Sequence, residues 1–135
     1  MKASIIASTL ALFSGALATP LIAARAAAPA QLFTFGLTND ISGASAASSV
    51  AINAGPVPLR NIFPWATNLW KDGKLIATSA QNINPAVQNV FCIFQDPASG
   101  RVIKINDIIT FADLDGQVGK AVETDVTNFT ILCEQ

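Results

Sequence analysis

"TNLWKDGKLIATSA", residues 67–80, is the stretch that decides the fold of this 135-residue chain. At its centre Asp72-Gly73 suits a tight turn that needs positive φ, and apolar residues flank the dipeptide on both sides. Such a pattern is typical of a β-hairpin. The neighbouring segments are best interpreted as further strands around it.

A second hairpin is predicted downstream, in "NVFCIFQDPASGRVIKI" (89–105). Asp96-Pro97 fits the opening of a type I turn, which a glycine closes. Two more strands are expected toward the C-terminus: "DIITFADLDGQVG" (107–119), which ends in a glycine-containing turn, and "AVETDVTNFTILC" (121–133).

Upstream of the first hairpin, "QLFTFGL" (31–37) places Phe33, Phe35 and Leu37 on one face, which predicts a strand with a clear inner side. "TNDISGASAASS" (38–49) is rich in Gly, Ser and Ala and is expected to be a loop, because it lacks the hydrophobic stripe of a helix. The prolines that follow cannot donate to a sheet ladder, so their region is expected at an edge or in a turn.

Short strands, frequent turn signals and the lack of a convincing amphipathic helix after the N-terminal region predict an all-β fold. Residues 31–135 are expected to form a single-domain antiparallel β-sandwich or small β-barrel. No residue pattern in the chain decides between these two architectures.

The N-terminus has the pattern of a helical signal peptide, residues 1–18. Lys2 supplies a positive charge, an apolar run follows, and Ala16-Leu17-Ala18 is a small-residue cleavage site, although cleavage could extend to residue 28. Residues 19–30 form an Ala-rich linker. The apolar run is short for a bilayer, which needs about 20 residues. The sequence therefore predicts a secreted, extracellular protein without a transmembrane anchor.

An oxidising export route gives the two cysteines a role, because paired cysteines persist outside the cytosol. A Cys92–Cys133 disulfide is predicted, with two free buried thiols as the alternative. Strand alternation places both sulfurs inward. Cys92 shares its face with Val90 and Phe94, and Cys133 shares its face with Thr127, Phe129 and Ile131. Phe91 and Ile93, on the other face of their strand, are also apolar, so that strand is either covered on both sides or meets a partner.

Asn128 begins Asn-Phe-Thr, an N-glycosylation signal, and is the glycosylation candidate. In the expected last strand it shares the outer face with Val126, Thr130 and Leu132. An outward asparagine would leave room for a glycan.

The composition argues against an enzyme. The chain has no histidine, which excludes Ser-His-Asp and Cys-His arrangements and His-ligated metals. No catalytic residue, metal site or cofactor is predicted. A glycoside hydrolase would need two facing carboxylates, but turns explain most of the acidic residues. Asp113-Leu114-Asp115-Gly116 matches part of a calcium loop but lacks the later ligands, so a plain turn is preferred.

Phe63, Trp65 and Trp70 form an aromatic cluster in the sequence. Since interface hot spots favour Trp, the cluster is a candidate binding patch, although core packing is the preferred interpretation. The basic residues form no cluster, so nucleic-acid binding is not expected.

Four features are similar to a known family: the signal peptide, "TNDISGASA", "LIATSAQ" and "VFCIFQDPASG". Over most of residues 31–135 the chain resembles small secreted fungal proteins that elicit the hypersensitive response in plants. The resemblance implies a β-rich apoplastic protein that plant cells perceive and that triggers defence or cell death. It implies no catalytic residues.

Three functions remain open at this point. The first is a secreted fungal effector or elicitor that binds a plant cell-surface protein or a cell-wall carbohydrate. The second is a structural or surface-coating protein of the fungal cell wall, supported by the high apolar content and the Phe91/Ile93 face. The third, least favoured, is a small carbohydrate-active enzyme with a carboxylate pair. The oligomeric state stays undetermined.

Overall fold

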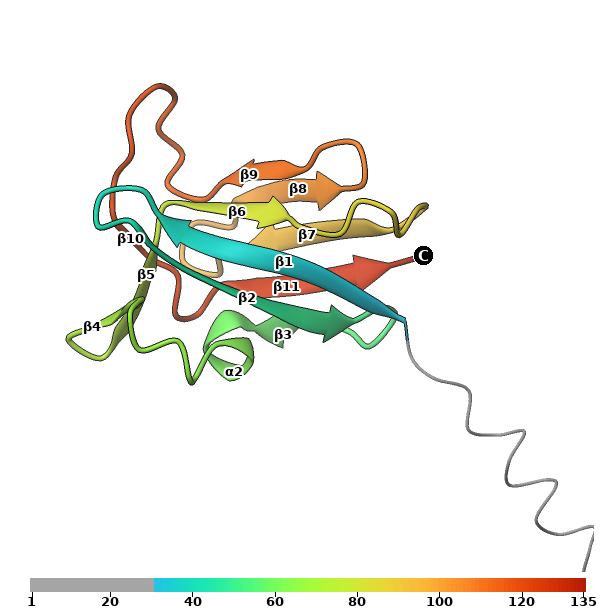
Figure 1. The fold of residues 1–135 in the computed structure, drawn as a ribbon, viewed down its shortest axis with the longest axis horizontal. Coiled ribbons are helices and arrows are strands. Elements are labelled where there is room, and N and C mark those ends of the chain that lie inside the picture. The colour runs from blue at the N-terminus through green and yellow to red at the C-terminus, as the bar shows by residue number, and fades with distance from the viewer. Residues whose placement is uncertain (1–30) are drawn as a thin grey trace, which may run out of the picture. The chain divides into compact units, whose positions relative to one another are not determined.

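The computed structural model describes residues 31–135, which form one compact unit (Figure 1). The predicted signal peptide (1–18) and Ala-rich linker (19–30) lie outside the described residues and stay predictions. The described chain is nearly all β: antiparallel sheets pack face to face and none closes on itself. The predicted all-β sandwich is confirmed, and the barrel alternative was wrong.

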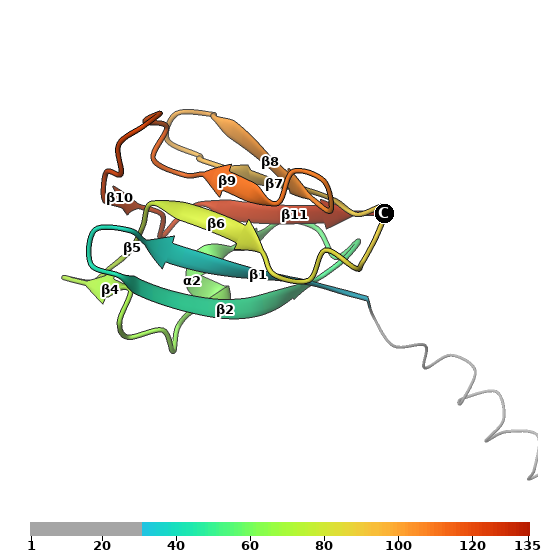
Figure 2. The same ribbon diagram turned by 45° about the horizontal axis from the view of Figure 1, so that its top comes forward.

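Two four-stranded sheets form the sandwich. The first sheet has the order β2-β1-β6-β9, with β1 Leu32–Asn39, β2 Ala44–Ala51, β6 Ser79–Asn82 and β9 Phe111–Asp113. The second sheet has the order β3-β11-β7-β8, with β3 Val57–Pro58, β7 Phe91–Gln95, β8 Val102–Asn106 and β11 Thr130–Glu134. Figure 2 shows β6, β1 and β2 of the first sheet side by side.

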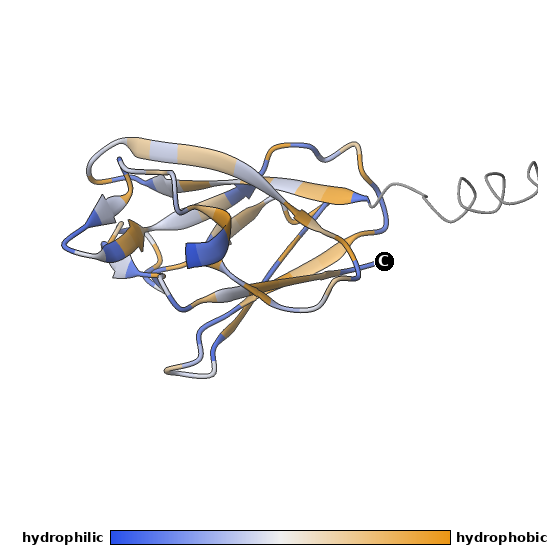
Figure 3. Cartoon of the chain, turned by 90° about the horizontal axis from the view of Figure 1, so that it is seen from below, coloured by the Kyte–Doolittle hydropathy of each residue, from blue (hydrophilic) through white to orange (hydrophobic). Residues whose placement is uncertain are grey.

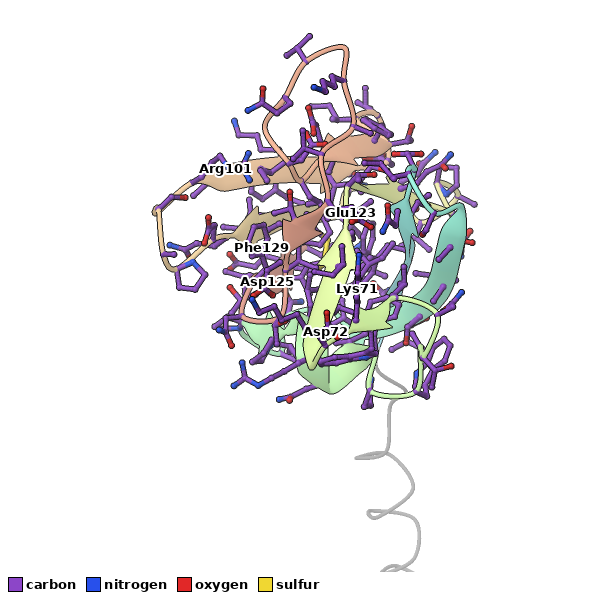
Figure 4. All side chains as sticks on the ribbon, turned by 90° about the vertical axis from the view of Figure 1, so that its left-hand side faces the viewer. Lys71, Asp72, Arg101, Glu123, Asp125 and Phe129 are labelled. Carbon is purple, nitrogen blue, oxygen red and sulfur yellow. A yellow bond between two sulfur atoms is a disulfide. The ribbon has the colours of Figure 1, made fainter. Side chains whose placement is uncertain are left out.

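A small third sheet, ordered β10-β5-β4, consists of β4 Trp70–Lys71, β5 Lys74–Ala77 and β10 Thr124–Asp125. Glu123, the residue before β10, joins this sheet to β1, because Asn39 Nδ2 donates to Glu123 Oε2 at 2.6 Å. Lys71 Nζ of β4 lies 3.6 Å from Oε1 of the same carboxylate (Figure 4). One short helix, α2 Leu59–Ile62, is visible as the coil in the middle of Figure 3 and carries both polar and apolar residues.

The core lies between the inner faces of the two large sheets. Phe33, Phe35 and Leu37 of β1 are buried, as their alternation predicts. The Phe35 ring meets Phe94 of the second sheet edge-on, with the ring centroids 5.6 Å apart. It meets Phe63 in the same way at 5.4 Å. Edge-to-face contacts of this kind add stability beyond the buried area, and here they join the two layers.

Both predicted hairpins are present. Asp72 and Gly73 take φ values of 52° and 75°, as the tight turn between β4 and β5 requires. The β7–β8 hairpin pairs Gln95 with Val102, and Gly100 has a φ of 74°. In each turn, positive φ explains the glycine.

The loop expected over residues 38–49 was wrong. Only the turn after Asn39 fits it, and β2 pairs with β1 along the full length of both strands. Asn39 starts the turn, because its Oδ1 accepts hydrogen bonds from the N–H groups of Ile41 and Ser42. The backbone of β1 forms hydrogen bonds with β2, whose small side chains give no clear hydrophobic alternation in the sequence. Tertiary pairing therefore overrides the local composition.

The single strand expected over 121–133 was also wrong. It is split into β10 and β11, with a turn at 126–129. The turn breaks the alternation, so Val126 is fully buried instead of lying on the outer face. From Asn128 onward the predicted alternation holds: Asn128 is exposed, and Phe129, Ile131 and Cys133 are buried. The proline region is at an edge, since β3, which contains Pro58, pairs only with β11.

Candidate functional site

The predicted disulfide joins Cys92 of β7 to Cys133 of β11. Both residues are buried in the sandwich core. It connects neighbouring strands of the second sheet rather than the two sheets. The C-terminal strand is thereby held covalently to the middle of that sheet.

The structure brings the three residues of the aromatic cluster together but buries most of it. Phe63 is completely buried in the core, as the core-packing interpretation expected for it. Trp70 is half-buried, and its Nε1 donates to the carbonyl oxygen of Phe63 at 2.8 Å. Trp65 is 56 % exposed, with its ring centroid 6.0 Å from that of Phe63. Of the predicted binding patch, Trp65 alone offers a largely open aromatic surface.

Asn128 lies exposed in the turn before β11. Its Oδ1 accepts a hydrogen bond from Arg60 Nη1 at 2.6 Å. A glycan would be attached through Nδ2, which makes no hydrogen bond to any residue of 31–135. The position is therefore open to modification, and glycosylation stays a prediction.

Three carboxylates line a hollow of about 180 Å³ beside the end of β9: Asp40, Asp113 and Asp115. The Asp40 carboxylate accepts hydrogen bonds from the hydroxyls of Thr78 and Ser79. Lys120 also lines this hollow, which we call the acidic hollow.

Hydrogen bonding to the neighbouring Asp115 side chain is the main reason why the pKa of Asp113 is raised. Partial burial also raises the pKa of Asp115, but hydrogen bonds from Asp113 and from the Val122 and Gln117 N–H groups outweigh it, so this pKa is lowered. The two groups thus titrate as a pair that holds one proton over part of the acid range.

Hydrogen bonding assigns Asp113 and Asp115 to a turn. The Asp113 Oδ1 atom accepts from the N–H groups of Asp115 and Gly116, at 3.2 and 3.3 Å. Across residues 31–135, no three acidic or cysteine side chains are grouped so as to hold a metal ion. The plain turn preferred for Asp113-Leu114-Asp115-Gly116 accounts for these contacts.

A groove of about 380 Å³ crosses the outer face of the first sheet. Gly36 of β1 lies at its floor, between its strand partners Ala47 of β2 and Gln81 of β6. Thr38 and Ser45 line the groove as well. No charged side chain lines it. We call it the sheet groove.

Ile83 is the largest exposed apolar side chain that lines the sheet groove, and it is 48 % exposed. Phe111, the strand partner of Gln81 on β9, is 58 % exposed and lines the acidic hollow. Thr38 is the strand partner of Ser79, which in turn pairs with Asp113. The sheet groove and the acidic hollow therefore adjoin on one face of the sandwich.

Gly36 is a glycine for which the fold gives no reason. Its φ is not positive, and a Cβ atom built there would meet only ordinary neighbours, at 3.6 Å from the Ala46 carbonyl oxygen and 3.9 Å from Ile83 Cγ2. Glycine in a strand costs stability relative to alanine. A glycine inside a strand often marks a place where a ligand approaches the backbone closely.

The outer face of the second sheet is partly apolar. Phe91 and Val102 are 44 % and 49 % exposed, and Ile93 and Leu132, direct partners across β7 and β11, are half-buried. The sequence left two interpretations of β7: either both of its faces are covered, or its outer face meets a partner. Within residues 31–135 the outer face is not fully covered, so the first interpretation does not hold. The face is open to a partner.

Sequence reasoning missed the sheet groove. Its residues come from β1, β2 and β6, and β2 was expected to be a loop. Gly36, between the inward Phe35 and Leu37, was the one available signal, since a strand interior rarely benefits from glycine.

No protein-family model matches this chain. Neither a curated protein nor a solved structure matches it. Among residues 31–135, no helix is long and apolar enough to cross a membrane.

Proposed function

We propose that this chain is a secreted, effector- or elicitor-like protein that acts by binding in the plant apoplast and triggers defence or cell death. The observation that carries the proposal is the sheet groove: a preformed, open hollow on the outer face of a disulfide-linked sandwich. Binding sites are commonly preformed concavities with a few directed polar groups. The export pattern and the resemblance to elicitors support binding outside the fungal cell.

Leaf infiltration tests this function. Purified protein is infiltrated into several hosts over a dose series, and a defence response is expected to rise with dose. The matched control is the same protein after reduction and alkylation of Cys92 and Cys133, which should lose the response as the last strand loosens. Absence of a response at every dose and in every host would refute the proposal.

A cell-wall coating function is the second candidate. It is favoured by the exposed apolar residues on the outer face of the second sheet, Phe91 and Val102. Contiguous exposed apolar surface commonly marks an interaction site. Culture fractionation distinguishes the two candidates: protein that stays wall-bound until detergent is added supports coating, and freely soluble protein supports the effector.

The carbohydrate-active enzyme remains the weakest candidate. Asp113 and Asp115 accept hydrogen bonds from backbone N–H groups of one turn. The two carboxyls of a glycosidase instead flank a sugar ring, about 5 Å or more apart. A sugar-release screen with the Asp113→Asn/Asp115→Asn protein tests it. Activity in the wild type that vanishes in this variant would revive the enzyme.

A further inference from the structure

We infer that the sheet groove binds an uncharged oligosaccharide. The inference rests on the proposed function, because it takes the groove as the binding surface of an apoplastic protein and specifies the ligand. Four features of the groove support the inference. Its lining has no charged side chain, and it mixes polar with apolar groups. Its floor strand, β1, is paired on both sides, and Gly36 on that strand has no structural explanation.

The groove lining matches the two kinds of surface that a sugar ring presents. A sugar carries hydroxyls around its edge and C–H groups on its faces. Thr38, Ser45 and Gln81 offer hydroxyl and amide groups, and the Gln81 side chain makes no hydrogen bond to any residue of 31–135. Ile83 offers apolar contact within the groove. The exposed Phe111 ring lies on the next strand beside Gln81, where a longer chain could reach it, and the negative face of an aromatic ring favours polarised C–H groups.

The backbone under the groove disfavours an extended peptide as the ligand. From Phe35 to Thr38, at the floor of the groove, β1 pairs with β2 on one side and with β6 on the other. A peptide that joins a sheet needs an unpaired edge strand. The free edge of β2 faces away from β1, so such a peptide would bind beside the groove and not across its floor. On the floor itself side chains are the free groups, and a ligand with many hydroxyls uses such side chains best.

Electrostatics favours a neutral glycan over an anionic one. Thr38 is separated from Asp113 by one strand, a spacing of two interstrand steps or about 10 Å. The acidic hollow adds the carboxylates of Asp40 and Asp115 on the same side, and Lys120 offsets one of these charges. A uronic-acid polymer in the groove would lie slightly beyond one Debye length, about 8 Å at physiological salt, so its repulsion is partly screened and grows as the salt is lowered. Uncharged glucose-type chains meet no such repulsion.

A substitution at Gly36 tests the inference specifically, because a side chain at this position would fill the groove without disturbing the turns or the core. In Gly36→Val the branched side chain would occupy the floor beside Ile83. Gln81→Ala removes the free amide. Gln95→Ala is the matched control, because Gln95 is an exposed glutamine that faces outward from the second sheet.

The experiment is NMR titration of the ¹⁵N-labelled protein with neutral β-1,3- and β-1,4-linked glucose oligosaccharides, with oligogalacturonates as the charged comparison. We expect saturable shifts at Gly36, Thr38 and Gln81 for a neutral series and none for the uronates. Gly36→Val should weaken binding by at least about tenfold, a loss of 1.4 kcal/mol, and Gln95→Ala should stay within about twofold. A cooperative unfolding transition at or above the wild-type midpoint, together with a dispersed amide spectrum, establishes that each variant is folded.

Three results would overturn the inference: no shifts with any neutral oligosaccharide at millimolar concentration, shifts confined to the second sheet, or binding that Gly36→Val leaves intact. The two experiments distinguish failure of the oligosaccharide inference from failure of the proposed function. A leaf response without glycan binding would refute the oligosaccharide ligand alone and would indicate a protein ligand. Glycan binding without a leaf response would refute the elicitor function alone.

Discussion

Cys92 and Cys133 are direct partners across β7 and β11, with their Cα atoms 4.1 Å apart although they are 41 positions apart in sequence. The spacing is close to that of a non-hydrogen-bonded pair in an antiparallel ladder, about 4.5 Å. The disulfide therefore reinforces a pairing that the sheet already makes, and its main effect is on the unfolded chain.

Removing the disulfide should strongly destabilise the protein. The Cys92→Ala/Cys133→Ala variant is expected to lose about 4 kcal/mol of unfolding free energy, since a loop of this length is released in the unfolded state. Urea unfolding measures the loss, and wild type in reductant is the control and should approach the variant. Two free thiols titrated in the unreduced secreted protein would contradict the bond.

Gly36→Ala should stabilise the protein. The Cβ atom meets no close neighbour and φ is not positive, so the substitution mainly restricts the unfolded chain, by about 0.4–1 kcal/mol. Gly73→Ala is the contrasting control, because its φ of 75° should make alanine cost about 1–2 kcal/mol. Chemical unfolding compares the two. Destabilisation by Gly36→Ala would show that the strand itself requires this glycine.

The two tryptophans should differ in accessibility. Trp65 is 56 % exposed, whereas Trp70 is half-buried and bonded to the Phe63 carbonyl. In the Trp70→Phe variant the remaining Trp65 fluorescence should be quenched efficiently by iodide. In Trp65→Phe, quenching should be weaker. Trp70→Phe should also cost about 1 kcal/mol of stability through its lost hydrogen bond. Equal quenching in both variants would contradict the arrangement.

Acid should weaken the β7–β8 turn. The Ser99 hydroxyl, donating to Asp96 Oδ2 at 2.7 Å, is the main reason why the pKa of Asp96 lies below its ordinary value. A carboxyl whose pKa is lowered by folding stabilises the protein above its unfolded pKa, about 3.9, and loses this contribution as the pH falls through the folded value. In Ser99→Ala the Asp96 midpoint should rise in a ¹³C carboxyl titration. An unchanged midpoint would exclude the hydroxyl as the cause.

Protein secreted from a eukaryotic host should carry a glycan at Asn128. The residue is exposed in a turn, and its Nδ2 is not used by the fold. Mass spectrometry before and after glycosidase treatment measures the modification, which Asn128→Gln should abolish. Asn68→Gln, at an exposed asparagine outside any sequon, is the control and should keep the glycan. An unmodified wild-type mass would contradict the prediction.

The sequence by itself determined the elements whose signals are local. Asp72-Gly73 specifies a turn because few residues tolerate positive φ at two successive positions, and the alternation of Phe33, Phe35 and Leu37 specifies an inner face because side chains alternate along any strand. The same alternation placed Cys92 and Cys133 inward. Each inference depends on a few neighbouring residues.

Tertiary structure alone decided the rest. Residues 44–51 form a strand because β1 pairs with them along their full length. The stabilisation comes from this pairing, which the Ala- and Ser-rich composition of the segment does not reveal. The turn that buries Val126 interrupts a pattern that reads as one strand. The sheet groove exists because Gly36, Ala47 and Gln81 become neighbours across three strands. Sequence periodicity specifies which way a side chain faces within its own strand, but the residue beside it on the next strand is fixed only when the strands pair.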